Sequence, residues 1–394
     1  MIDVLIACSH LRWQGVWQRP NHILTRLARR LPVLVVEEPQ LLPPGAECFA
    51  ADEAVHSAET QLRRLETDGL TVLIPERAAR PSDIVDGPTI AAVRAFIGSR
   101  NAAFWLYSPL FLPLAQAAPA APLIYDKMDE LAAFDFADPR IGAREKELLA
   151  RAAVVFAGGR GLWGSVRERA HAGGPYPSGV DVAHYARARN DHGKTSAKTQ
   201  RRGPHADVQQ ARRHPAAQRP VFGYVGVIDE RLDLHLIAEL ASARPDAQLV
   251  FVGPIVKIDP ATLPRADNIT YVGQRAYAEL PDIIATFAVA LMPFALNRAT
   301  RFISPTKTLE YLAAGRPVVS TPIADVIAGF ADVVTIADRA AFPAAVAAAE
   351  HPDERRRERG YRLAATFSWD ALVDRMVADL ASNGVNFPAQ RIGM

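Results

Sequence analysis

Short apolar runs alternate with amphipathic segments along most of the chain. Such runs predict strands at 2–8, 33–36, 70–74, 103–107, 123–125 and 154–157, and again at 221–225, 248–252, 269–272, 289–292, 318–320 and 333–336. Because helical segments separate many of these runs, the pattern favours parallel sheets with crossover helices. The sequence therefore predicts an α/β chain built from two Rossmann-like doubly wound domains.

The periodic pattern disappears between residues 187 and 219, where nine Lys or Arg stand against two Asp. This composition is typical of a linker or an exposed insertion. We predict an N-terminal domain over 1–180, a basic linker over 181–219, a C-terminal domain over 220–366, and a closing helix and tail over 367–394. Leu372, Met376 and Leu380 form one apolar stripe on that closing helix. The carboxyl ends of the strands in the two domains are expected to face each other across a cleft.

Composition narrows the class of protein. A chain of 394 residues with 49% hydrophobic and 22% charged residues is long enough for two domains with sizeable cores. No apolar run reaches the roughly 20 residues of a membrane span, and no signal peptide is evident. Cys8 and Cys48 are too few for a disulfide scaffold. We expect a cytoplasmic protein whose basic linker rests on anionic lipid at the membrane surface, and the net charge of +2 gives no general case for nucleic acid.

Residues 304–315 predict a short helix whose first turn suits an anion. Ser304 is a good N-cap, Pro305 fits the first helical position, and Gly315 supplies a left-handed stop. The first-turn N–H groups attract phosphate, and Lys307 adds a positive charge there, next to Thr306. Glu310, one turn further, is suited to accept both hydroxyls of a ribose. The alternative is a well-capped helix whose Lys and Glu are merely solvated.

This segment, SPTKTLEYLAAGRPVVST, resembles the donor site of GT-B fold glycosyltransferases, in particular relatives of glycosyltransferase family 4. The resemblance implies that Lys307 meets the diphosphate of a UDP- or GDP-linked sugar and that Glu310 meets its ribose. It also implies a retaining reaction with no cofactor. The family often has a second Glu eight residues before the ribose Glu, but Phe302 stands at that position here. Contact with the donor sugar should therefore differ.

Two further strand ends carry donor-site candidates. Gly226 and Gly253 follow predicted strands and let a ligand approach the backbone, and Arg231 is placed to pair with phosphate oxygens. A surface ion-pair cluster formed by Asp229, Glu230, Arg231 and Asp233 remains the alternative for this arginine.

The loop after the first strand is rich in Trp and Arg. Aromatic rings cover apolar sugar faces and Arg binds hydroxyls or acids, so this loop is a candidate acceptor site; its candidates are His10, Trp13, Gly15, Trp17 and Arg19. Its WQRP text resembles the acceptor loop of a bacterial subgroup of the same glycosyltransferases. Alternatively, Trp17 packs under the following helix and Arg19 is solvated.

Carboxylates follow the strand 123–125. Asp129 and Asp126 are candidates for a general base near the acceptor hydroxyl, while Asp129 would also serve as a helix N-cap. No Asp-X-Asp pair follows a strand and the His spacing fits no ligand set, so we predict no metal site. Lys307, Arg231 and the helix N-terminus would then meet the leaving diphosphate.

The combined pattern predicts a glycosyltransferase that moves a sugar from a nucleoside diphosphate donor to a carbohydrate or lipid-linked acceptor. The resemblance places such enzymes in cell-envelope or exopolysaccharide synthesis. Two alternatives stay open: a nucleotide-sugar epimerase or phosphorylase of the same architecture, and a catalytically silent sugar-nucleotide-binding subunit. A dinucleotide oxidoreductase is disfavoured because the first strand is not followed by G-x-G-x-x-G.

Overall fold

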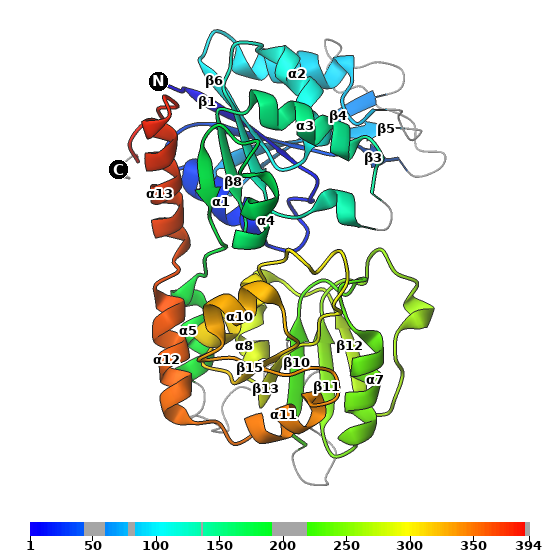
Figure 1. Cartoon of the computed structure of the whole chain (residues 1–394). Helices are drawn as coiled ribbons and strands as arrows, with labels where there is room; N and C mark the ends of the chain where they lie inside the picture. The colour runs from blue at the N-terminus through cyan, green and yellow to red at the C-terminus, as the bar shows by residue number, and fades with distance from the viewer. Residues whose placement is uncertain (43–59, 78–82, 135–136, 191–218, 391–394) are drawn as a thin grey trace. The chain divides into compact units, whose positions relative to one another are not determined.

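The chain forms two compact units, each with its own sheet and helices (Figure 1). The computed structural model describes residues 1–42, 60–77, 83–134, 137–190 and 219–390. The first unit comprises Met1–Pro177 together with Asp370–Met394, and the second comprises Ser178–Trp369. Both units are α/β with mostly parallel sheets, so the predicted fold class is confirmed.

The sheet of the first unit has the order β3-β5-β2-β1-β6-β7-β8-β9, with β4 paired to β5. Its strands are β1 (Val4–Ser9), β2 (Val33–Glu37), β3 (Gln40–Leu41), β4 (Thr60–Thr67), β5 (Leu70–Arg77), β6 (Ala102–Leu106), β7 (Leu123–Lys127), β8 (Val154–Ala157) and β9 (Gly173–Pro175). Its helices are α1 (Arg19–Leu27), α2 (Gly87–Ile97), α3 (Ile141–Arg151), α4 (Arg160–Val166) and α13 (Trp369–Ser382), with 3-10 turns at Pro109–Ala117 and Leu131–Ala133.

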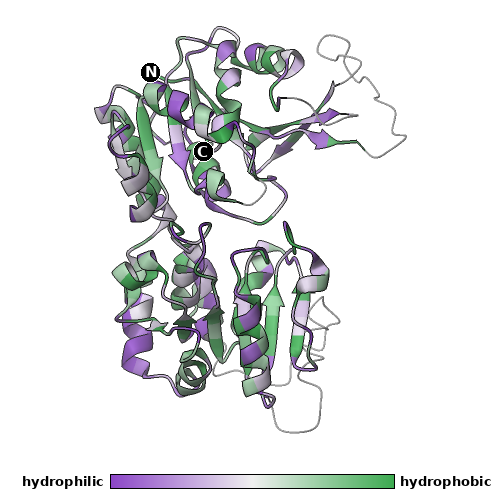
Figure 2. Ribbon diagram, turned by 45° about the vertical axis from the view of Figure 1, so that its right-hand side comes forward, coloured by the Kyte–Doolittle hydropathy of each residue, from purple (hydrophilic) through white to green (hydrophobic). Residues whose placement is uncertain are grey.

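The central strands of this sheet are buried along their whole length. Every residue of β1, β2, β6, β7 and β8 is buried, as in parallel sheets covered on both faces. Figure 2 shows these strands mostly in the green of apolar residues. This burial explains why uninterrupted apolar runs in the sequence locate the strands.

A β-hairpin at one side of the first sheet was not predicted. β4 pairs with β5 in antiparallel register, from Thr60 opposite Arg77 to Thr67 opposite Leu70. Asp68 and Gly69 join the strands with φ of 51° and 77°, the left-handed geometry of a two-residue hairpin turn. An Asp-Gly pair between strands is a strong sequence signal for such a turn, so the hairpin was detectable from the sequence.

The sheet of the second unit has the order β12-β11-β10-β13-β14-β15, and all its pairings are parallel. Its strands are β10 (Val221–Val225), β11 (Gln248–Val252), β12 (Ile269–Gly273), β13 (Val289–Met292), β14 (Val318–Ser320) and β15 (Thr335–Ile336). Its helices are α5 (Val182–Asn190), α7 (Leu234–Ala243), α8 (Leu280–Ile284), α9 (Thr306–Ala313), α10 (Ala324–Phe330), α11 (Phe342–Ala349) and α12 (Glu354–Ala365), with 3-10 turns at Pro260–Thr262 and Tyr277–Glu279.

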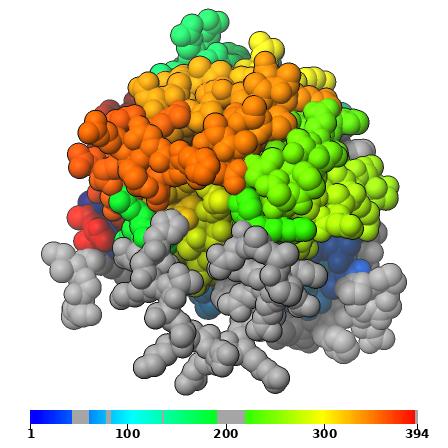
Figure 3. Space-filling model, turned by 90° about the horizontal axis from the view of Figure 1, so that it is seen from below, coloured from blue at the N-terminus to red at the C-terminus, as the bar shows by residue number. Residues whose placement is uncertain are grey.

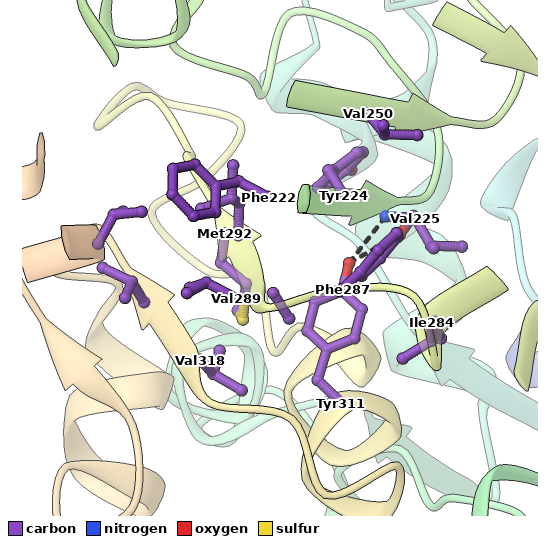
Figure 4. Packing of buried hydrophobic residues seen from close by; sticks show 14 of the residues in the cluster. Phe222, Tyr224, Val225, Val250, Ile284, Phe287, Val289, Met292, Tyr311 and Val318 are labelled. Carbon is purple, nitrogen blue, oxygen red and sulfur yellow. Dashed lines mark hydrogen bonds between the residues drawn. The ribbon is translucent and has the colours of Figure 1, made fainter. Parts of the chain in front are cut away.

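Part of the core of the second unit lies between its sheet and α9 (Figure 4). Phe222, Phe287 and Met292 are each at most 1% exposed. Tyr311 of α9 reaches the end of β10, where its hydroxyl accepts a hydrogen bond of 2.8 Å from the Val225 N–H. This bond fixes α9 against the strand whose carboxyl end forms part of the site described below.

α7 and α11 lie next to each other on the surface of the second unit (Figure 3). The Arg244 guanidinium, just after α7, pairs with Glu350 just after α11 and with Asp246. Glu239 of α7 accepts a hydrogen bond of 2.9 Å from Arg339 Nε. These ion pairs link α7 and the residue after it to the segments at the two ends of α11.

The predicted linker begins with a helix that belongs to the second unit. In α5, Tyr185 and Ala188 are each 1% exposed and pack in the main core. An apolar stripe at helical spacing is formed by Val182, Tyr185 and Ala188. A count of composition misses this stripe, because Arg187 and Arg189 lie between and after its residues. Residues 182–190 are therefore not a linker, and the predicted lipid contact through the remaining basic stretch falls on 191–218, outside the described residues.

A buried arginine fastens three helix ends in the second unit. Arg316 is 3% exposed and donates hydrogen bonds of 3.1–3.3 Å to the carbonyls of Ala188, Ala285, Phe287 and Ala314. These carbonyls belong to the last turn of α5 and to the residues that end or follow α8 and α9, where backbone oxygens lack helical partners. Burial lowers the pKa of Arg316 to about 10. The negative ends of the helix dipoles thus stabilise this guanidinium, as a carboxylate would otherwise do.

The last helix, α13, packs with the first unit. Leu372, Met376 and Leu380 are at most 2% exposed, and the Ile2 N–H donates to the Asn386 carbonyl at 2.8 Å. The predicted closing helix that returns to the first domain is therefore present. Within the described parts of the chain, none of the helices combines the length and the hydropathy of a membrane span.

Candidate functional site

The carboxyl ends of three adjacent strands in the second unit are joined by backbone hydrogen bonds between glycine-containing loops. The Gly226 N–H donates to the Val252 carbonyl at 2.8 Å, and the Gly253 N–H donates to the Gly273 carbonyl at 2.9 Å. Gly226 and Gly253 have φ of 150° and 148°, and a Cβ on Gly253 would lie 2.0 Å from the Gly226 carbonyl oxygen. Two of the predicted donor-site residues thus lie in direct backbone contact.

Lys307, in the first turn of α9, lies across Gly226. A Cβ built on Gly226 would be 1.9 Å from Lys307 Cε and 2.5 Å from its Nζ. The ammonium is also 5.7 Å from the centre of the Tyr224 ring. Only a glycine at position 226 leaves room for the lysine side chain. The structure thus places the Lys307 ammonium at the carboxyl end of β10, where an anion site at this edge of the sheet requires a positive charge.

The helix that carries Lys307 begins one residue later than predicted. Its N-cap is Pro305, with φ of −69° and ψ of 114°, and the helix proper starts at Thr306, so the predicted cap role of Ser304 is wrong. Proline fixes φ near this value in both the N-cap and the first helical position, and the sequence could not separate them. The N-cap residue makes no side-chain hydrogen bond to the helix, while Gly315 has the predicted left-handed φ of 66°. An anion could therefore serve as its cap.

Glu310 lies one turn beyond Lys307 and is partly exposed. Burial raises the pKa of its carboxyl, and Lys307 together with the Tyr185 hydroxyl partly opposes that rise. A lysine and a carboxylate on the same face of one helix, near strand ends, can bind a phosphate and a diol at the same time.

Arg231 is held by a carboxylate of its own loop. Its Nε donates to both oxygens of Asp229 at 3.0 Å, and its Nη2 donates to Oδ2 at 2.7 Å. Asp233 instead caps α7 by accepting from the Leu236 N–H at 2.9 Å. The geometry thus contains the Asp229–Arg231 ion pair that the sequence left open as the alternative to a phosphate contact.

In the loop after β1, Trp13 is part of the interior. It is 5% exposed, its N–H donates to Glu37 Oε1 at 2.6 Å, and its indole N–H donates to Asp68 Oδ2 at 2.9 Å. Gly15 closes a turn by donating to the Arg12 carbonyl at 3.0 Å. A stacking face for a sugar therefore does not come from Trp13, which packs within the first unit.

Trp17 and His10 are partly exposed in the same loop. The Trp17 ring packs edge-on against Trp13 at 6.1 Å, and its indole N–H donates to His22 Nδ1 of α1 at 3.4 Å. Trp17 thus packs on the start of the helix, as the alternative hypothesis predicted, while part of its surface stays accessible.

Arg19 and Asp126, predicted for acceptor binding and catalysis, form a buried ion pair. Asp126 is 0% exposed within β7, and Arg19 is 3% exposed at the start of α1. Arg19 Nε donates to the two Asp126 oxygens at 3.0 and 3.1 Å, and its Nη1 donates to the Tyr176 carbonyl at 2.7 Å. Both side chains are thus buried, so Arg19 is not solvated and Asp126 is not exposed.

Asp129 follows β7 and is partly exposed. The 3-10 turn at Leu131–Ala133 has Glu130 at its N-cap position, so the alternative role of Asp129 as that cap is wrong. Glu130 also pairs with the buried Lys127 at 3.0 Å, and Lys127 in turn contacts Glu145 at 2.5 Å. Of the two predicted carboxylates, Asp129 is the one that remains accessible.

The described part of the chain contains no group of three or more His, Cys, Asp or Glu placed to hold a metal ion. Sequence reasoning missed Tyr185, which lies on α5, the helix that packs against α9, but belongs to a segment interpreted as linker. The apolar spacing of Val182, Tyr185 and Ala188 was the available signal.

Solved structures with the same fold cover nearly the whole chain. A sucrose-phosphate synthase from Thermosynechococcus elongatus superimposes with a TM-score of 0.68 at 14% identity, over 96% of this chain and 98% of that one. HepE of Anabaena, in complex with UDP-glucose, gives a TM-score of 0.67 at 14% identity, over 96% and 99%. A trehalose-phosphate synthase from Burkholderia vietnamiensis gives 0.63 at 15%, over 97% and 99%. The chain has the GT-B fold of these proteins.

Sequence comparison finds similarity over part of the chain. Residues 219–350, which include all the donor-site candidates, match the family described as Glycosyl transferases group 1. The chain is also 32% identical over 104 residues to a putative teichuronic acid biosynthesis glycosyltransferase, TuaH, of Bacillus subtilis (strain 168). That alignment spans 26% of this chain and 26% of TuaH, about a quarter of each.

Proposed function

We propose that this protein is a glycosyltransferase that moves a sugar from a nucleoside diphosphate donor to a carbohydrate or lipid-linked acceptor. The observation that carries the proposal is Lys307 lying across Gly226, with Glu310 one turn further along the same helix. These residues fall within the segment that matches group 1 glycosyl transferases. HepE, of the same fold, was solved with UDP-glucose, which supports a nucleotide sugar as donor.

In the proposed reaction the leaving diphosphate gains negative charge as the sugar departs. The Lys307 ammonium and the N-terminal end of α9, whose N-cap residue makes no side-chain hydrogen bond to it, are placed to stabilise that charge without a metal ion. Glu310 would hold the ribose and so fix the position of the diphosphate. We propose a retaining, metal-independent reaction, and the resemblance to TuaH supports a role in cell-envelope polysaccharide synthesis.

Replacing Lys307 with alanine is expected to weaken nucleoside diphosphate binding by about 1.5 to 3 kcal/mol, the range for a hydrogen bond to a charged group. The bare nucleoside should bind almost as before. Glu310→Gln should weaken both ligands, because both contain the ribose. Calorimetric titration of each ligand into each variant makes the comparison, with the exposed Lys146→Ala as a charge-matched control. Wild-type affinities in both variants would refute the proposed donor site.

Asp129→Asn should lower the rate of transfer by at least about a hundredfold, the lower range for loss of a general base. Donor affinity and melting temperature should stay near those of the wild type, since Asp129 belongs to the other unit and Glu130 holds the N-cap position of the following 3-10 turn. Transfer assays with extracted lipid-linked and free sugars as acceptors test this, with the exposed Asp267→Asn as the control. An unchanged rate would remove Asp129 from the mechanism.

A further inference from the structure

α5 is fixed firmly beside the helix that carries Glu310. The Ala188 carbonyl in its last turn accepts from Arg316, and Arg187 Nη2 donates to the Ala278 carbonyl at 3.0 Å. The His184 ring stacks on Tyr277 at 4.1 Å, and its Nε2 lies 3.0 Å from the Tyr277 carbonyl oxygen. α5 contacts both α8 and α9. These contacts leave the helix little freedom to turn or slide.

The side chain of Tyr185 points from α5 into the core of the second unit, where α5 packs against α9, the helix that carries Glu310. The residue is 1% exposed, and its ring packs edge-on against Tyr277 at 5.9 Å. Its hydroxyl has no hydrogen-bond partner that meets normal geometry among the described residues. Burial raises the pKa of this hydroxyl, and the Glu310 carboxyl and the Tyr277 hydroxyl raise it further, while Tyr185 in turn lowers the pKa of Glu310.

A buried hydroxyl without a partner is unfavourable, whereas phenylalanine would fill the same space without that penalty. A tyrosine at this position is therefore explained best by a hydrogen bond that forms when Glu310 is held in its ligand-binding orientation. Because a carboxylate has about four acceptor sites, one of its oxygens can accept from Tyr185 while the other accepts from a diol.

We propose that Tyr185 is a positioning residue that orients the Glu310 carboxylate for the two ribose hydroxyls of the donor nucleotide. This inference rests on the proposed function. The Tyr185 hydroxyl donates to one carboxylate oxygen of Glu310 and directs the second toward the ligand. Residue 185 thus contributes to the choice of ribonucleotides over deoxyribonucleotides, although it touches no ligand atom itself.

The test compares Tyr185→Phe with Tyr271→Phe, a matched control whose hydroxyl donates to the Pro264 carbonyl at 3.1 Å, on an outer strand of the same sheet. The titrated probes are uridine and guanosine diphosphates, their 2′-deoxy analogues and inorganic diphosphate. Tyr185→Phe should weaken binding of the ribonucleotide that wild type binds by about tenfold to 150-fold, from the loss of one hydrogen bond to a charged group. The deoxy analogue should lose much less affinity, and inorganic diphosphate none.

A second comparison separates positioning from packing. In a Glu310→Gln background, Tyr185→Phe should cause little further loss, because the carboxylate that it orients is gone. Equal losses for ribo- and deoxynucleotides, or an undiminished loss in the Glu310→Gln background, would overturn the role of Tyr185. Failure of the wild-type protein to bind either nucleoside diphosphate would instead refute the proposed function, and with it this inference.

Discussion

Gly253→Ala should destabilise the second unit by roughly 2 to 6 kcal/mol, the sum of backbone strain and overpacking. The added methyl would lie 2.0 Å from the Gly226 carbonyl oxygen and 2.7 Å from its carbon, and φ of 148° already excludes most side chains. Backbone atoms cannot move aside as a flexible side chain can. The loops after β10 and β11 would have to separate, so Lys307 would lose its support on Gly226 and nucleoside diphosphate binding should disappear.

Chemical unfolding and titration of UDP and GDP measure the two consequences of Gly253→Ala. Gly273→Ala is the matched stability control in the same unit, because Gly273 has φ of 77° but nothing within 4 Å of an added methyl. It should lose only the strain of about 1 to 2 kcal/mol for a left-handed residue. If the two variants were equally stable, the close packing of Gly253 on Gly226 would not matter to the fold.

Arg19→Ala is expected to destabilise the first unit by about 3 to 5 kcal/mol, since it leaves the Asp126 carboxylate buried without its partner. An acceptor contact would instead lower transfer and leave stability unchanged. The control is Arg26→Ala on the same helix, whose partner Asp370 has a side chain that is 62% exposed, and which should lose at most about 1 kcal/mol. Thermal and chemical unfolding distinguish the two variants.

The pH dependence of the Arg19→Ala variant provides a second check. Burial raises the pKa of Asp126 and Arg19 opposes the rise, so removing Arg19 raises that pKa further. The folded variant then binds a proton at a pH where the unfolded chain has released it. Its loss of stability should be full above the raised pKa and should shrink as the pH falls through it. The double variant Arg19→Met with Asp126→Leu should recover much of the loss at neutral pH.

The strands were predictable wherever burial on both faces makes a run continuously apolar. Val154–Ala157, Val221–Val225 and Val289–Met292 have the bounds that the sequence indicated. β4 was missed because Thr60–Thr67 is largely polar: it pairs through one side only and has several exposed positions. A strand of this kind is detected by its Asp68–Gly69 turn, because its hydropathy gives no signal.

For the site, the sequence located groups that lie near one another along the chain. Lys307 and Glu310 share one helix, and their common face follows from helical geometry alone. Arg19 and Asp126 are 107 residues apart, and nothing local indicates that each neutralises the other inside the first unit. Likewise, the contact between Lys307 and Gly226 depends on how α9 packs beside β10, which no spacing in the sequence encodes.

Arg316 also bears on how freely the second unit can vary in sequence. Its four acceptors are backbone carbonyls, at Ala188, Ala285, Phe287 and Ala314. Carbonyl oxygens persist whatever side chain a residue carries, so substitutions in α5, α8 and α9 need no compensating change to retain these bonds. A side-chain ion pair in the same place would instead require both partner residues to be conserved together. All four hydrogen bonds depend on residue 316 alone, and we expect homologues to keep arginine at this position while the residues around it diverge.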